Sequence, residues 1–209
     1  MDRKKSGKYT REEALALVAR TGMSDGFARA WALALHDGFL LRIPGVMSLR
    51  DMLTEYVGLD NAYLEERIKA IFLDGKPVDD IDAAPVACGN ELSLSGAMPG
   101  VAGITMGRNN PIAVYREGIT FHCGGDCDEG AGLISVWLFN FIAKEAAPEF
   151  LALGVGLDQR AWQRVCADPA PGFWEPVARA TLDGREIAPG DLTSLPAPAP
   201  GTLRWLVIS

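Results

Sequence analysis

The side chains best suited to chemistry gather in residues 122–129, a stretch with the sequence His-Cys-Gly-Gly-Asp-Cys-Asp-Glu. One imidazole, two thiols and three carboxylates lie within these eight residues. Such groups ligate divalent metals such as zinc, and two cysteines separated by a short, glycine-containing turn can also form a disulfide. The stretch therefore predicts a metal or redox site made by His122, Cys123, Asp126 and Cys127.

A plainer interpretation of residues 122–129 is a polar turn, in which Cys123 ends a strand and an acidic residue at 128 or 129 favours the N-terminus of a helix. Cys88 and Cys166 are expected to be small hydrophobic residues that are at least half-buried. If a metal binds, one of these two thiols or a water molecule would complete its coordination. Elemental analysis together with thiol counting separates a metal site, a disulfide and inert cysteines.

A second candidate site is the glycine-rich stretch 96–107, which follows a predicted strand and contains four glycines. Exposed backbone N–H groups in such a loop can bind an anion, and Arg108 adds a cation at its end. The spacing matches neither a P-loop nor a dinucleotide-binding fingerprint. The ligand-binding hypothesis names Gly100, Gly103 and Arg108, and its alternative is a glycine loop required only for close packing.

Residues 14–35 fit the outline of a DNA-binding helix-turn-helix with Gly22 in the turn. The second helix, however, would present Asp25 and Arg29 to DNA, whereas contacts to bases and phosphates need several donors. The chain also has 20 Lys and Arg against 27 Asp and Glu, a formal net charge of -7. This balance disfavours nucleic acid and anionic membranes as partners, and it favours a plain helical hairpin over a DNA-associated regulator.

Histidine is scarce, because only His36 and His122 are present. Two histidines exclude a multi-histidine metal site within one chain and leave few bases for a catalytic triad. His36 precedes Asp37 and Gly38, where a histidine at a helix end commonly binds the last carbonyl groups.

The first third of the chain has helical periodicity. Residues 1–9 are expected to be a flexible basic tail, and residues 10–66 a helical lobe. Helices are predicted from Thr10, Ser24, Ser48 and Asp60, each of which can cap free N–H groups. In the second of these helices, an apolar stripe recurs at helical spacing in Phe27, Ala30, Trp31, Ala34 and Leu35.

The remaining residues, 67–209, are expected to form an α+β core that is one compact unit with the lobe. Strands are predicted before and after the turns Asp74-Gly75 and Asp183-Gly184, and also over 90–95 and 112–123. The apolar stretch 130–147 predicts a buried central helix, and 158–166 a last helix. The fold class is therefore α+β, with mainly antiparallel hairpins packed on a buried apolar helix.

The two Asp-Gly turns sit in similar surroundings, because each is followed by a loop and then by another strand. One explanation is that Asp-Gly is the commonest solution for a tight hairpin. The other is that two similar units lie in one sheet.

Composition limits the class of protein. The chain has 209 residues with 48% hydrophobic residues, which indicates a globular protein, and no uncharged stretch reaches membrane-spanning length. Charged residues replace the apolar part of a secretory signal, so a cytoplasmic protein with reduced thiols is expected.

No complete catalytic set is apparent. We therefore expect a noncatalytic ligand-binding or protein-interaction protein, with a small molecule, a protein or a second copy as partner. A thiol- or metal-dependent enzyme and a DNA-associated regulator are the alternatives.

Overall fold

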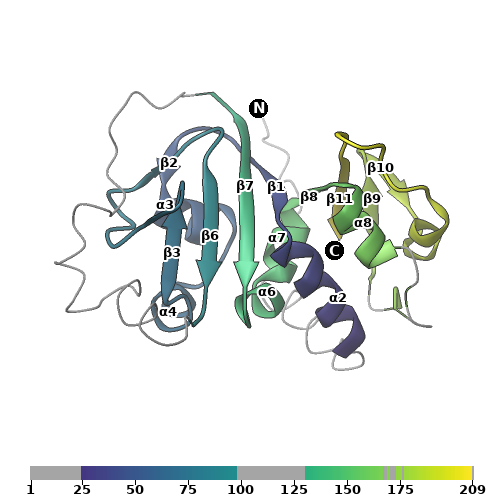
Figure 1. Cartoon of the computed structure of the whole chain (residues 1–209), viewed down its shortest axis with the longest axis horizontal. Coiled ribbons are helices and arrows are strands. Elements are labelled where there is room, and N and C mark those ends of the chain that lie inside the picture. Colours follow the sequence, from purple (N-terminus) through teal and green to yellow (C-terminus); the bar gives the residue numbers. More distant parts are fainter. Residues whose placement is uncertain (1–24, 98–129, 167–168, 170–172, 176, 209) are drawn as a thin grey trace, which may run out of the picture.

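The computed structural model describes residues 25–97, 130–166, 169, 173–175 and 177–208. These form a large mixed sheet with helices packed against it, which confirms the α+β class (Figure 1). The sheet has nine strands in the order β10 (Arg185–Ile187), β9 (Ala180–Leu182), β11 (Arg204–Ile208), β8 (Val155–Leu157), β1 (Phe39–Ile43), β7 (Gly132–Phe139), β6 (Glu91–Ser95), β3 (Ala70–Leu73) and β4 (Lys76–Pro77). All neighbouring strands are antiparallel except β6 and β7, which are parallel.

Most of the helices are short. They are α2 (Asp25–His36), α3 (Leu49–Asp51), the π-helix η2 (Met52–Tyr56), α4 (Asn61–Glu66), α6 (Ile142–Glu145), α7 (Ala147–Leu153), α8 (Gln159–Cys166) and the 3-10 helix η4 (Pro189–Ser194). A small separate ladder joins β2 (Met47–Ser48) to β5 (Pro85–Val86). In the described residues, no helix is both long enough and apolar enough to cross a bilayer.

Most of the predicted helices are confirmed, and so are the caps at Ser48 and Asp60, whereas the predicted cap at Ser24 lies outside the described residues. The Ser48 hydroxyl accepts a hydrogen bond from Asp51 N at 3.0 Å, and the Asp60 carboxylate accepts one from Ala62 N at 2.8 Å. In α2, Trp31, Ala34 and Leu35 are buried as their spacing requires, and α8 begins one residue after the predicted start. The predicted helix starting at Thr10 and the predicted strand 112–123 lie outside the described residues.

The predicted buried helix over 130–147 is wrong. Residues 132–139 form β7, and the helical part begins only with α6 and continues into α7. Strand β7 pairs with β1 on one side and β6 on the other, and Ile134, Val136 and Leu138 point into the core. A central strand whose second face also carries apolar residues is apolar almost all round, so periodicity alone cannot distinguish it from a buried helix.

The segment expected to be a helical lobe also supplies a strand. Strand β1 lies in the middle of the sheet, between β8 and β7. Its residues alternate between buried and more exposed side chains, with Phe39, Leu41 and Ile43 in the core. The helices of this segment therefore pack on a sheet to which the segment itself contributes.

The two Asp-Gly hairpins lie in one sheet, at its opposite ends. Both aspartates have positive φ angles, 50° for Asp74 and 51° for Asp183, as this tight turn requires. Each carboxylate accepts a hydrogen bond at 2.8 Å from a backbone N–H of a later strand, Asp74 from Glu91 and Asp183 from Trp205. The two units therefore share a turn and also the way in which the turn holds the next strand, which favours the interpretation of two similar units in one sheet.

The Asp183 carboxylate makes the folding of its hairpin dependent on pH. Partial burial raises its pKa, but hydrogen bonds from Trp205 N and from Arg204, at 2.7 Å, outweigh burial and lower the pKa below its ordinary value. A carboxyl with a lowered pKa stabilises the fold above its unfolded pKa, and this stabilisation is lost as the pH falls through the folded pKa.

We expect Asp183→Asn to lower the free energy of unfolding by about 1 kcal/mol at pH 7, because asparagine keeps the turn but loses the charge. Urea unfolding measured between pH 7 and pH 3 should show this difference shrinking as the wild-type carboxyl becomes protonated. Asp191→Asn, at an exposed site, is the control. A difference between wild type and Asp183→Asn that stays constant down to pH 3 would contradict the assignment.

A candidate binding groove between α2 and α6

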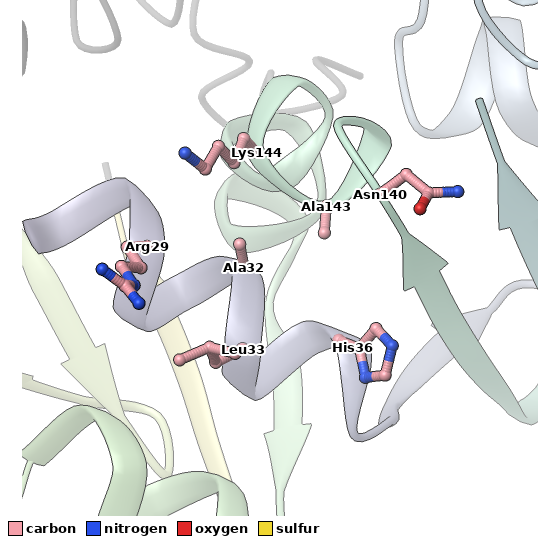
Figure 2. A pocket seen from close by; sticks show the side chains of 7 residues that line it. All are labelled: Arg29, Ala32, Leu33, His36, Asn140, Ala143 and Lys144. Atoms are coloured by element: carbon pink, nitrogen blue, oxygen red, sulfur yellow. The ribbon is translucent and has the colours of Figure 1, made fainter. Parts of the chain in front are cut away.

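A groove of about 450 Å³ lies between α2 and α6, close to the end of β7. Figure 2 shows it from nearby, with α2 forming one wall. The described residues that line it are Arg29, Ala32, Leu33, His36, Asn140, Ala143 and Lys144. The first four come from α2 and the last three from the segment that joins β7 to α6.

The wall made by α2 is the face opposite its buried stripe. Arg29, Ala32, Leu33 and His36 are spaced by three, one and three residues, so they share one side of the helix. Trp31 and Leu35, on the other side, are no more than 1% exposed. One helix thus contributes both to the core and to the groove, and it leaves Leu33 47% exposed.

The other wall is held in place by Asn140. This residue has a φ of 56°, a left-handed conformation that asparagine tolerates better than most residues. Its side-chain amide donates hydrogen bonds to the Ser95 hydroxyl at 2.9 Å and to the Ala97 carbonyl at 2.6 Å. The turn between β7 and α6 is thereby fastened to the end of β6, which positions Ala143 and Lys144 at the groove.

The carboxylate of Glu145, next to Lys144, is paired with a cation outside the groove. Glu145 forms a two-point ion pair with Arg67, whose guanidinium also lies over the Phe141 ring at 4.2 Å from its centre. The Tyr63 hydroxyl lies in the same cluster, where burial, reinforced by the Glu145 charge, raises its pKa. These contacts join α4 to α6 and direct the charge of Glu145 toward Arg67.

The carboxylate of Asp37, next to His36, is also paired with cations outside the groove. Asp37 lies 2.5 Å from Arg164 and 3.4 Å from Arg160, both on α8. His36 Nδ1 is 3.9 Å from the nearer oxygen of Asp37, and the imidazole packs edge-on against Phe139 with ring centres 4.9 Å apart. Asp37 therefore serves chiefly to join α2 to α8.

The groove is positively charged on an acidic protein. No carboxylate is present among its described lining residues, and within the described part of the chain neither Arg29 nor Lys144 forms an ion pair. In Figure 2 these two cations lie toward one end, His36 and Asn140 toward the other, and apolar side chains between them. The arrangement can hold a negative group and an apolar group side by side.

None of the site residues predicted from the sequence is among the residues that the structure describes. Gly100, Gly103 and Arg108, and likewise His122, Cys123, Asp126 and Cys127, are outside the described residues, so both hypotheses stay predictions. Sequence analysis singled out Arg29 and His36 but not as one site. The exposed Leu33 between them was the available signal, because a leucine on the polar side of an amphipathic helix is unexpected.

The two remaining cysteines differ from each other. Cys166 is 1% exposed, and burial raises the pKa of its thiol to about 12, which confirms the expectation of a small hydrophobic residue. The same expectation for Cys88 is wrong, because this residue is exposed, at the start of β7, against Gly132. In the described ranges no group of three or more His, Cys, Asp or Glu residues could hold a metal.

The sheet and the groove define an α+β protein with a cationic groove beside its central strands. Comparison of the chain with models of known families, with curated proteins and with solved structures finds no match.

Proposed function

We propose that this is a noncatalytic binding protein whose α2–α6 groove takes an acidic ligand with an apolar portion. The observation that carries the proposal is the pair of cations, Arg29 and Lys144, that form no ion pair within the described residues beside an apolar floor. In a chain with a net charge of -7, such a patch is where an anion is attracted. The ligand's apolar portion would cover Ala32, Leu33 and Ala143.

The lining chemistry favours binding over catalysis. The described lining residues include one imidazole, that of His36, and no hydroxyl, thiol or carboxylate that could act together with it. An open groove with two solvent-exposed cations binds weakly, because exposed ion pairs contribute about 1 kcal/mol or less each. Affinity for a small ligand is therefore expected in the millimolar to high-micromolar range, about −4 to −6 kcal/mol.

The test compares two ligands that differ only in charge, 4-phenylbutyrate and its neutral amide, 4-phenylbutanamide. We expect the carboxylate to shift amide resonances of α2 and α6 in a nitrogen-15 NMR titration, and the amide to bind at least threefold more weakly. Arg29→Gln and Lys144→Gln should each weaken carboxylate binding about threefold, which corresponds to about 0.7 kcal/mol.

Matched controls remove a positive charge elsewhere. Arg185→Gln on β10 and Lys76→Gln on β4 change the net charge by the same amount at exposed sites near the ends of the sheet. They should leave the affinity unchanged. Equal binding of the carboxylate and the amide, or equal effects of groove and control variants, would contradict the proposal.

The second candidate function is the thiol- or metal-dependent one predicted from His122, Cys123, Asp126 and Cys127. One observation favours it: the exposed thiol of Cys88 lies at the start of the strand that follows this cluster in the sequence. Cys166 is buried and less suited to complete a coordination sphere, so Cys88 is the cysteine that thiol counting and elemental analysis should address first. The cytoplasmic location and a homodimer likewise stay expectations.

A further inference from the structure

The polar groups of the groove are spread along a helix axis and do not gather at one point. Arg29 and His36 are seven residues apart on α2, which corresponds to about 10.5 Å along the axis. On the other wall, Figure 2 shows Lys144 toward the Arg29 end of the groove and Asn140 toward the His36 end. One small carboxylate cannot contact both ends. A ligand that uses the whole groove must therefore be elongated and must follow α2.

The middle of the groove has the shape that a third helix requires. Ala32 and Ala143 are small, so a neighbouring backbone can approach the two walls closely, and Leu33 projects between the ends. Helices pack by inserting rows of side chains into such grooves, with axes about 8 to 10 Å apart. The lining of α2 from Arg29 to His36 gives about 10.5 Å of wall, which matches roughly two turns of a docked helix.

We propose that the groove docks an acidic amphipathic helix of a partner protein. This inference rests on the proposed function and names the class of ligand. The apolar stripe of the partner helix would lie on Ala32 and Leu33, beside the buried Ala143, and its glutamate or aspartate side chains would face Arg29 and Lys144. Charge complementarity supports this occupant, because these cations form no ion pair within the described residues and the lining has no described carboxylate to repel it.

The complex should be weak and sensitive to salt. Two turns of helix cover less surface than the roughly 1,200 Å² that stable interfaces bury, so a transient, micromolar interaction is expected. The charged contacts lie at the exposed rim, where salt screens them. Raising the ionic strength from about 0.05 M to about 0.5 M should therefore weaken binding several-fold.

The experiment uses two fluorescein-labelled peptides of 16 residues with one composition of Leu, Ala and Glu. In the first peptide, leucines and glutamates segregate onto opposite helix faces, and in the second the same residues are shuffled so that they mix. Circular dichroism verifies that both have similar helix content. By fluorescence anisotropy with the full chain, we expect the segregated peptide to bind at least tenfold more tightly.

Variants of the full chain locate the binding. Leu33→Asp should reduce affinity for the segregated peptide more than tenfold, and Arg29→Gln with Lys144→Gln together should do the same. The paired controls Arg185→Gln and Lys76→Gln should have no effect. Every substituted side chain is exposed, and the near-ultraviolet spectrum of each variant verifies that it is folded.

The possible results separate the two proposals. If 4-phenylbutyrate binds through Arg29 and Lys144 but the two peptides bind equally, the helical partner is excluded and the acidic-ligand proposal survives. If neither the small carboxylate nor either peptide depends on these cations, both proposals fail. If the segregated peptide binds tightly but Leu33→Asp has no effect, the partner docks elsewhere and the inference about this groove is overturned.

Discussion

Replacing Phe150 with alanine is expected to lower the free energy of unfolding by about 4 kcal/mol, because this removes a fully buried ring and leaves a cavity. Phe150 lies on α7, is 0% exposed, and packs at a steep angle against Phe39 of β1 with ring centres 5.4 Å apart. This contact joins the helix after β7 to the middle of the sheet. Urea unfolding followed by tryptophan fluorescence measures the loss.

The control is Phe72→Ala on β3. Phe72 is half-buried, on the face of the sheet opposite Ile71 and Leu73, so its loss should cost about 1 to 2 kcal/mol. The comparison also tests whether residues 132–153 form β7, α6 and α7 and not one buried helix. If these residues formed one helix that ended near Pro148, Phe150 would not be anchored on β1, and the two variants would be destabilised by similar amounts.

The second large effect is expected at Gly38, which follows α2 and leads into β1. Its φ is +100°, and a Cβ atom built there would lie 2.5 Å from the indole nitrogen of Trp137. Gly38→Ala therefore combines an unfavourable backbone conformation with a clash against a ring that is packed on the neighbouring strand. We expect a loss of about 3 kcal/mol in the free energy of unfolding.

Gly58 provides a matched control, because it also follows a helix and has a φ of +93°, yet a Cβ atom there would meet nothing within 4 Å. Gly58→Ala should cost only the backbone term, about 1 kcal/mol. The difference between the two variants isolates the contact with Trp137. Equal destabilisation would show that the indole moves aside without cost.

Local features of this chain followed from its sequence. Several local features formed where they were expected. They are the caps at Ser48 and Asp60, the apolar stripe of α2, helix α8 and both Asp-Gly turns. Each of these depends on residues within about four positions of one another, through a capping hydrogen bond, a helical repeat or a turn that tolerates positive φ. Such interactions depend only on neighbouring residues, so they can be predicted without the rest of the fold.

Tertiary structure decided the conformation of residues 130–153. The apolar run there is compatible with a buried helix or a central strand, and its pairing with both β1 and β6 selects the strand. Pro148 then falls in the first turn of α7, where the missing N–H costs nothing, so it does not end a helix. Strand β1 was decided in the same way, by pairing with residues about 90 or more positions away.

The groove depends on long-range contacts. Its walls come from α2 and from residues 140–144, over a hundred positions later, and no local pattern pairs them. The sequence by itself determined that α2 carries Arg29, Leu33 and His36 on one polar side, because helical spacing requires it. Only the tertiary fold places Lys144 opposite, because the pairing of β7 with β1 brings α6 beside α2.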